Sequence, residues 1–91
     1  PEDWPRIIYI DWFGNLVTGI RAASLSHDGQ LGIAGYIIPR AGTFSEVPEG
    51  MAFWYENSMS LIEIAVNRGA ADEELDVEVG ERIEPMPVHQ R

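Results

Sequence analysis

Three polar or aromatic stretches, each placed between apolar segments of the chain, could together bind a flat, polar ligand. They comprise residues 11–15, 43–50 and 57–60. Their side chains supply a carboxylate, two amides, a hydroxyl and two aromatic rings: Asp11, Asn15, Asn57, Ser58, Phe13 and Phe44. Aromatic rings stack on a planar ligand, amides read its hydrogen-bonding edge, and a carboxylate pairs with an ammonium group or a sugar hydroxyl. A site for a flat, ring-shaped ligand needs these groups.

The segments that must position these side chains are short and rich in β-branched and aromatic residues, with Gly, Pro, Asn and Asp between them. This pattern predicts strands over residues 6–11, 16–20, 31–33, 36–38, 51–56, 61–66, 77–79 and 82–84. Asp28-Gly29 is a hairpin signal, and Ala70–Leu75 is the one helical candidate. We therefore expect an all-β fold, either a small β-barrel or two packed antiparallel sheets, with one short helix near Ala70–Leu75.

The same residues also allow plainer interpretations. Asp11 could cap a turn, and Gly14-Asn15 could simply be that turn. Phe13 and Phe44 could belong to the core. Only if the loops gather at one end of a barrel would they form a single mouth. Alternation along residues 51–56 sends Trp54 to the face opposite its neighbours.

Composition narrows the class of protein. The 91 residues suit one domain, and the net charge of −9 repels nucleic acid and anionic membranes. There is no Cys, and two His are too few for a convincing metal cluster. No apolar run approaches a membrane span and no signal peptide is visible, so we expect a cytoplasmic protein. The absence of an initiator Met predicts a piece of a longer protein.

Three sequence blocks carry a resemblance to a known family. Asp-Trp-Phe-Gly-Asn at 11–15 is followed by Leu-Val-Thr, residues 43–50 read Thr-Phe-Ser-Glu-Val-Pro-Glu-Gly, and Asn57-Ser58 precedes Leu-Ile-Glu-Ile-Ala-Val-Asn-Arg-Gly at 61–69. In this order and spacing they resemble the C-terminal domain of the S-adenosylmethionine-cleaving family. That family includes the fluorinase, the chlorinase and the hydroxide adenosyltransferases. The similarity extends from about Arg6 to Glu84.

The resemblance implies a set of substrate-binding residues: Asp11, Phe13, Asn15, Phe44, Asn57, Ser58, Met59, Val66 and Arg68. It implies that Asn15 bonds the adenine edge, that Phe44 stacks on the adenine and that Phe13 lines the nucleoside pocket. Backbone groups near Val66 and Arg68 would complete adenine recognition.

Two further positions concern the methionine end of the substrate. By the same resemblance, Asp11 and Ser58 would hold its amino-acid group. The halogenases carry Arg where this chain has Met59, which argues against carboxylate binding by that side chain and against a halogenase.

The implied reaction is attack of water on the ribose C5′, which releases adenosine and methionine with no cofactor beyond the substrate. The resemblance places the water-activating groups in an N-terminal domain, so no catalytic residue is expected here. It also implies a homotrimer in which that domain of one subunit completes the site. We expect a linker at 1–5, the C-terminal domain at 6–85 and a tail at 86–91. The alternatives are a stand-alone nucleoside-binding or interaction module and a halogenase fragment.

Overall fold

The structure is a computed structural model that describes residues 2–42 and 46–87. Phe44, expected to stack on adenine, therefore lies outside the described residues. Within them the strands are β1 (Trp4–Ile10), β2 (Leu16–Arg21), β3 (Gln30–Ile33), β4 (Tyr36–Ile38), β5 (Ala52–Glu56), β6 (Leu61–Val66) and β7 (Glu84–Met86). A 3-10 turn, η1 (Ala22–Ser24), follows β2, and the α-helix α1 (Ala71–Leu75) follows β6.

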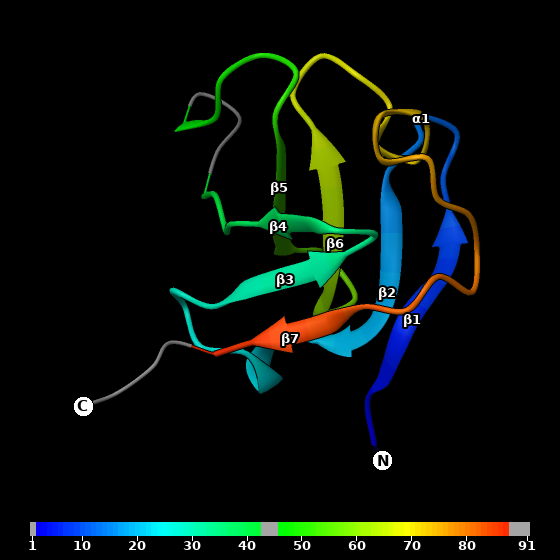
Figure 1. Cartoon of the computed structure of the whole chain (residues 1–91). Coiled ribbons are helices and arrows are strands. Elements are labelled where there is room, and N and C mark those ends of the chain that lie inside the picture. The colour runs from blue at the N-terminus through cyan, green and yellow to red at the C-terminus, as the bar shows by residue number, and fades with distance from the viewer. Residues whose placement is uncertain (1, 43–45, 88–91) are drawn as a thin grey trace.

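The described strands form two antiparallel sheets rather than one closed barrel. One sheet has the order β1-β2-β6-β5 and the other β4-β3-β7. Figure 1 shows the three-stranded sheet crossing in front of the four-stranded one, with α1 beside the upper ends of β1 and β2. The prediction of an all-β fold with two packed antiparallel sheets and one short helix is confirmed.

The main core lies between the two sheets and takes alternate residues from each strand. Ile62, Ile64 and Val66 of β6 face it, together with Trp54 of β5. The intervening residues of β5 and β6 lie on the other face, where Phe53 and Ala65 form a smaller apolar cluster with Ala41. This confirms that Trp54 points away from its neighbours, as the two-residue period of a strand requires.

Near the C-terminus one predicted strand is absent and another is displaced by two residues. Residues 77–79 form no strand, because Asp76 adopts a left-handed conformation (φ 55°) after α1 and redirects the chain. The last strand lies at Glu84–Met86 and includes Pro85, which was expected to end it. Pro85 is tolerated because β7 is an edge strand, where a missing N–H interrupts no second ladder.

The hairpin predicted at Asp28-Gly29 is also absent, because β2 and β3, on either side of it, belong to different sheets. The tight hairpin lies at Ala34-Gly35, between β3 and β4, where both residues have positive φ of 50° and 87°. Positive φ at both central residues matches the right-handed strand twist. No helix among residues 2–42 and 46–87 has the length and apolar content needed to cross a membrane.

Gly14 joins the β1–β2 turn to helix α1. Its φ is +83°, and a Cβ there would lie 2.4 Å from Asp72 Oδ1 and 2.7 Å from the Cβ of Ala70. The backbone N–H of Asp72 donates to the Gly14 carbonyl oxygen at 3.1 Å. The helix thus packs so closely on this turn that only glycine fits both the space and the conformation.

We predict that Gly14→Ala lowers the free energy of unfolding by about 2–4 kcal/mol, since it adds a steric clash to the cost of left-handed backbone. Gly35→Ala is the matched control, because Gly35 also has positive φ but nothing lies within 4 Å of its Cβ position. The control should cost only about 1–2 kcal/mol. Urea denaturation measures both. Equal losses would show that contact with α1 does not constrain Gly14.

Candidate functional site

The turn between β1 and β2 is held by the side chain of Asp11. Its Oδ1 accepts the backbone N–H groups of Phe13 and Asn15, both at 2.9 Å. Asp11 and Asn15 also pair through their backbones at 3.0 Å. One carboxylate oxygen of Asp11 is therefore used by the turn, whereas Oδ2 has no hydrogen-bond partner among the described residues. The turn-capping alternative is correct for Oδ1, and Oδ2 is available to a ligand.

The aromatic side chains of this turn extend into solvent. Phe13 is 73% exposed and the neighbouring Trp12 is 94% exposed. The side-chain amide of Asn15 is half-buried and has no partner within the part of the chain that the structure describes. An unpaired amide next to a carboxylate oxygen and an exposed ring is suited to hydrogen-bond and stack on a ring-shaped ligand.

The β5–β6 turn is held by a second polar side chain. Asn57 Oδ1 accepts the backbone N–H groups of Met59 and Leu61 at 2.9 and 3.0 Å, and its Nδ2 donates to Glu63 Oε1 at 3.1 Å. Ser60 adopts positive φ (64°) to close the turn. Both the oxygen and the nitrogen of the Asn57 amide thus form hydrogen bonds that stabilise the turn. Ser58 and Met59 stay exposed at its tip.

Glu63 and Tyr55 complete this arrangement, and sequence reasoning assigned neither to the site. Glu63 is only 8% exposed, and its Oε2 accepts the hydroxyl of Tyr55 at 2.5 Å. Burial, followed by the hydrogen bond and the negative charge of Glu63, raises the pKa of Tyr55 well above its ordinary value; Asp11 contributes in the same direction. The signal in the sequence was a single acidic residue in the apolar run of residues 61–66.

The turns at residues 11–15 and 57–60 do not meet at one end of the molecule, so the condition for a single mouth is not met by these two turns. Leu16, which follows the first turn, pairs with Ile64 near the end of β6, whereas the β5–β6 turn lies at the start of β6. The two turns therefore lie at opposite ends of the four-stranded sheet. What connects them is the sheet face that points away from the main core.

That outward face carries one continuous row of paired residues. The register aligns Tyr9 with Val17, Val17 with Glu63, and Glu63 with Tyr55 across all four strands. The charge of Asp11 acts on Tyr55 across the same face. We call this surface the outer face. It brings the Asp11 turn and the Tyr55–Glu63–Asn57 network to one side of the molecule.

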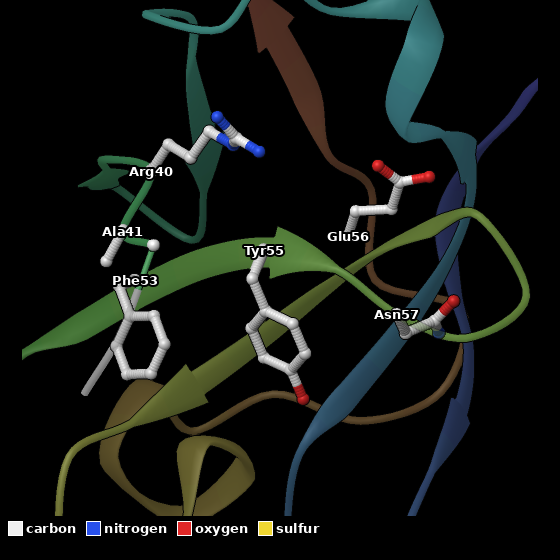
Figure 2. A pocket seen from close by; sticks show the side chains of 7 residues that line it. Arg40, Ala41, Phe53, Tyr55, Glu56 and Asn57 are labelled. Atoms are coloured by element: carbon white, nitrogen blue, oxygen red, sulfur yellow. The ribbon is translucent and has the colours of Figure 1, made fainter.

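A hollow of about 400 Å³ adjoins the outer face at strand β5. Its lining is Arg40, Ala41, Gly42, Phe53, Tyr55, Glu56 and Asn57. Figure 2 shows the rings of Phe53 and Tyr55 pointing the same way from β5 and Glu56 pointing the opposite way. The two ring centroids are 5.9 Å apart, with the planes tilted by 34°. Of the sequence-predicted residues that the structure describes, only Asn57 lines this hollow.

The remaining predicted residues lie near the other end of β6. Val66 is buried in the main core, so it could offer a ligand only backbone groups, and its carbonyl oxygen already accepts the N–H of Gly69 at 3.3 Å. Arg68 is exposed with a positive φ of 59°. The intervening Asn67 donates from Nδ2 to the Val47 carbonyl oxygen at 2.7 Å, which ties this turn to the segment before β5.

We predict that Asp11→Ala lowers the free energy of unfolding by about 1–2 kcal/mol, because two backbone N–H groups lose their acceptor. Asp11→Asn keeps an acceptor oxygen at the same position and should cost only about 0.5 kcal/mol. Thermal and urea unfolding of both variants measure the difference. If Asn destabilised as much as Ala, the negative charge rather than the turn geometry would be the stabilising feature.

We also predict a loss of stability at alkaline pH that depends on Tyr55. Its pKa is raised in the folded state, so above about pH 10 the unfolded chain releases this proton while the folded chain keeps it. The unfolding free energy must therefore fall as pH rises above that value. Tyr55→Phe removes this contribution, so its stability should decline less steeply. Parallel slopes for the two proteins between pH values of about 9 and 11 would contradict the prediction.

Relatives of the chain cover nearly its whole length. Residues 5–84 match the family described as the SAM hydroxide adenosyltransferase C-terminal domain. A protein of Thermus thermophilus named (R)-S-adenosyl-L-methionine hydrolase is 39% identical over 83 residues. That alignment covers 91% of this chain but only 30% of the relative, so the chain spans less than a third of that relative's length.

Solved structures show the same fold. A conserved hypothetical protein from Thermus thermophilus superposes with a TM-score of 0.80 at 36% identity, over 89% of this chain and 34% of that one. An uncharacterised conserved protein from Thermotoga maritima gives a TM-score of 0.78 at 25% identity, over 93% and 38%. With the family match over residues 5–84, these similarities show that the chain belongs to the SAM hydroxide adenosyltransferase family, as its C-terminal domain.

Proposed function

We propose that this chain supplies the substrate-binding part of an enzyme that cleaves S-adenosylmethionine with water to give adenosine and methionine. The observation that carries the proposal is the match to a relative named a hydrolase of this substrate, at 39% identity over 83 residues. The geometry of the outer face supports it, because an unpaired amide, a free carboxylate oxygen and aromatic rings lie together there.

In the proposed reaction a water oxygen attacks the ribose C5′ and the C5′–sulfur bond breaks. The bonding electron pair goes to sulfur, so the sulfonium becomes the thioether of methionine, and the attacking water loses one proton. A sulfonium is already a good leaving group, so the proposal includes no cofactor. The contribution of this chain is to position the substrate, which lowers the entropic cost of the reaction.

The side chains take different parts in this proposal. Asn15 reads the adenine edge, since its amide is not used by the fold. Asp11 holds an ammonium or hydroxyl group through Oδ2, and Phe13 covers the nucleoside. Asn57 acts through the turn that presents Ser58. The role of Phe44 in stacking on adenine belongs to the proposal as well.

The rest of the site comes, in this proposal, from a partner domain that supplies the groups activating water, within a homotrimer of the complete protein. Exposed aromatic residues support such a contact, because Trp12 is 94% exposed beside the Asp11 turn and Trp4 is exposed at the start of β1. Each of these large apolar side chains lies in solvent, and contact with a partner domain would cover it. S-adenosylmethionine and adenosine are the proposed ligands, in the cytoplasm, and nucleic acid is not a proposed partner.

The two alternatives are not favoured. A halogenase would be expected to carry a basic residue at the position of Met59, whose neutral side chain is 65% exposed at the tip of the β5–β6 turn. A stand-alone binding module has no observation in its support, whereas the relative that matches nearly the whole chain is named a hydrolase.

The test is to incubate the complete gene product containing this chain with S-adenosylmethionine in ¹⁸O-labelled water. We expect adenosine and methionine in equal amounts, with the label in the adenosine 5′-hydroxyl. Chromatography with mass spectrometry measures both products. Unlabelled adenosine, or a 5′-halogenated nucleoside on addition of chloride or fluoride, would contradict hydrolysis.

Ligand binding gives a separate test of the site. Asn15→Ala should weaken adenosine binding by about tenfold, because the buried edge of the ring loses its hydrogen bonds. Calorimetry on the same gene product measures this affinity. Gln30→Ala is the control, since Gln30 is an exposed amide on the other sheet. Equal affinity for the Asn15 variant and the control would remove Asn15 from the proposed site.

A further inference from the structure

Glu63 is a buried carboxylate without a cationic partner among the residues that the structure describes. It lies in the middle of β6, between Ile62 and Ile64, and only 8% of it is exposed. Its partners are the neutral Tyr55 hydroxyl at 2.5 Å and the neutral Asn57 amide at 3.1 Å. Burying a carboxylate is costly even when it is hydrogen-bonded, and an apolar residue would suit this strand better. A role beyond packing would explain the carboxylate at this position.

The two hydrogen bonds orient both partners. Because Glu63 accepts through both oxygens, the single hydroxyl proton of Tyr55 points at the carboxylate. The phenol oxygen can then only accept a hydrogen bond from anything on its other side. The same carboxylate holds the Asn57 Nδ2, which leaves Asn57 Oδ1 facing the N–H groups of Met59 and Leu61. The tip of the turn therefore depends on Glu63.

Both partners line the hollow beside β5, while Glu63 itself is not part of that lining. Figure 2 shows the Tyr55 ring directed away from Glu56 and Arg40, on the side of the strand that Phe53 also occupies. The Asp11 charge also reaches this region. A ligand group next to the Tyr55 oxygen thus meets an acceptor in a negatively charged surrounding, which favours an N–H or O–H donor.

We propose that Glu63 is a positioning residue of the substrate site: its carboxylate directs the Tyr55 hydroxyl and the Asn57 amide so that Tyr55 receives a hydrogen bond from a donor group of the substrate. This inference rests on the proposed function, because it takes S-adenosylmethionine as the substrate. Its donor groups are the ammonium, the adenine amine and the ribose hydroxyls. Glu63 acts through Tyr55 and Asn57 and does not touch the substrate.

Glu63→Gln is the decisive variant because it keeps the shape and removes the second acceptor. A glutamine amide offers one oxygen and one NH₂ group, so it cannot accept from Tyr55 and Asn57 through separate oxygens. Either one partner turns away, or the Tyr55 oxygen accepts from the glutamine NH₂ and its hydroxyl proton is no longer held by residue 63. Glu78→Gln, at an exposed position after α1, is the matched control.

The first measurement needs no substrate. The absorbance of tyrosinate is titrated in the wild type and in Tyr55→Phe, and the difference between the two curves isolates Tyr55. The two titrations are then repeated with Glu63→Gln added to each protein. The new difference curve should show that Tyr55 ionises at lower pH. An unchanged difference curve would overturn the proposal, since Glu63 would then not control the hydroxyl.

The second measurement uses the complete gene product and S-adenosylmethionine. We expect Glu63→Gln to raise KM by about tenfold while kcat changes less, because binding rather than water activation is impaired. Tyr55→Phe should behave alike, and the double variant should be no worse than the poorer single variant, because both act through one contact. The control should match the wild type. The proposal would be overturned if folded Glu63→Gln had the wild-type KM, or if the KM increases of the two single variants multiplied in the double variant.

The failure of the proposed function is distinguishable from the failure of this inference. A wild-type gene product that neither binds nor cleaves S-adenosylmethionine overturns the proposed function and the substrate contact, while the tyrosine titration still decides whether Glu63 orients Tyr55. If Glu63→Gln does not fold, Tyr55→Phe decides. A purely structural hydroxyl would alter stability but leave KM unchanged.

Discussion

The burial of strand β6 on both faces is the constraint on which the rest of the structure depends. From Ile62 to Val66 every residue of this strand is buried. It lies between β2 and β5 in the four-stranded sheet, so its backbone is paired on both sides. Its inward residues form the main core, and its outward residues, Glu63 and Ala65, form the floor of the outer face. A central strand with no solvent on either side makes every polar group on it expensive unless it is paired.

The cost explains why the polar groups around β6 form hydrogen bonds within the fold. Glu63 accepts hydrogen bonds from strand β5 and from the β5–β6 turn. Thr18 of β2 donates to the Ile62 carbonyl oxygen at 2.8 Å. Asn57 and Asp11 each stabilise a turn, and these two turns lie at opposite ends of the sheet. The groups still available to a ligand are those that the turns do not use, chiefly the Asn15 amide and one oxygen of Asp11. Recognition on the outer face therefore follows from what the fold leaves unpaired.

The predictions from sequence succeeded where the signal was local. The six strands that precede α1 could be placed to within two residues because alternation and turn residues act over short distances. They failed where the signal was ambiguous. Val77-Glu78-Val79 alternates like a strand, yet Asp76 turns the chain and no neighbouring strand among the described residues pairs with it. Pro85 was expected to end a strand, but the position of β7 at a sheet edge, a tertiary property, makes it acceptable.

The sequence by itself determined the all-β class and the family, because these depend on local periodicity and on motifs in a fixed order. Only the tertiary structure decided that the turns at Asp11 and Asn57 lie at opposite ends of one sheet, and that Asn15 is free while Asn57 is not. Both amides look equivalent in the sequence. Their difference arises because the backbone of its own turn and Glu63 of β6 use both ends of the Asn57 amide, whereas no described residue pairs with the Asn15 side chain.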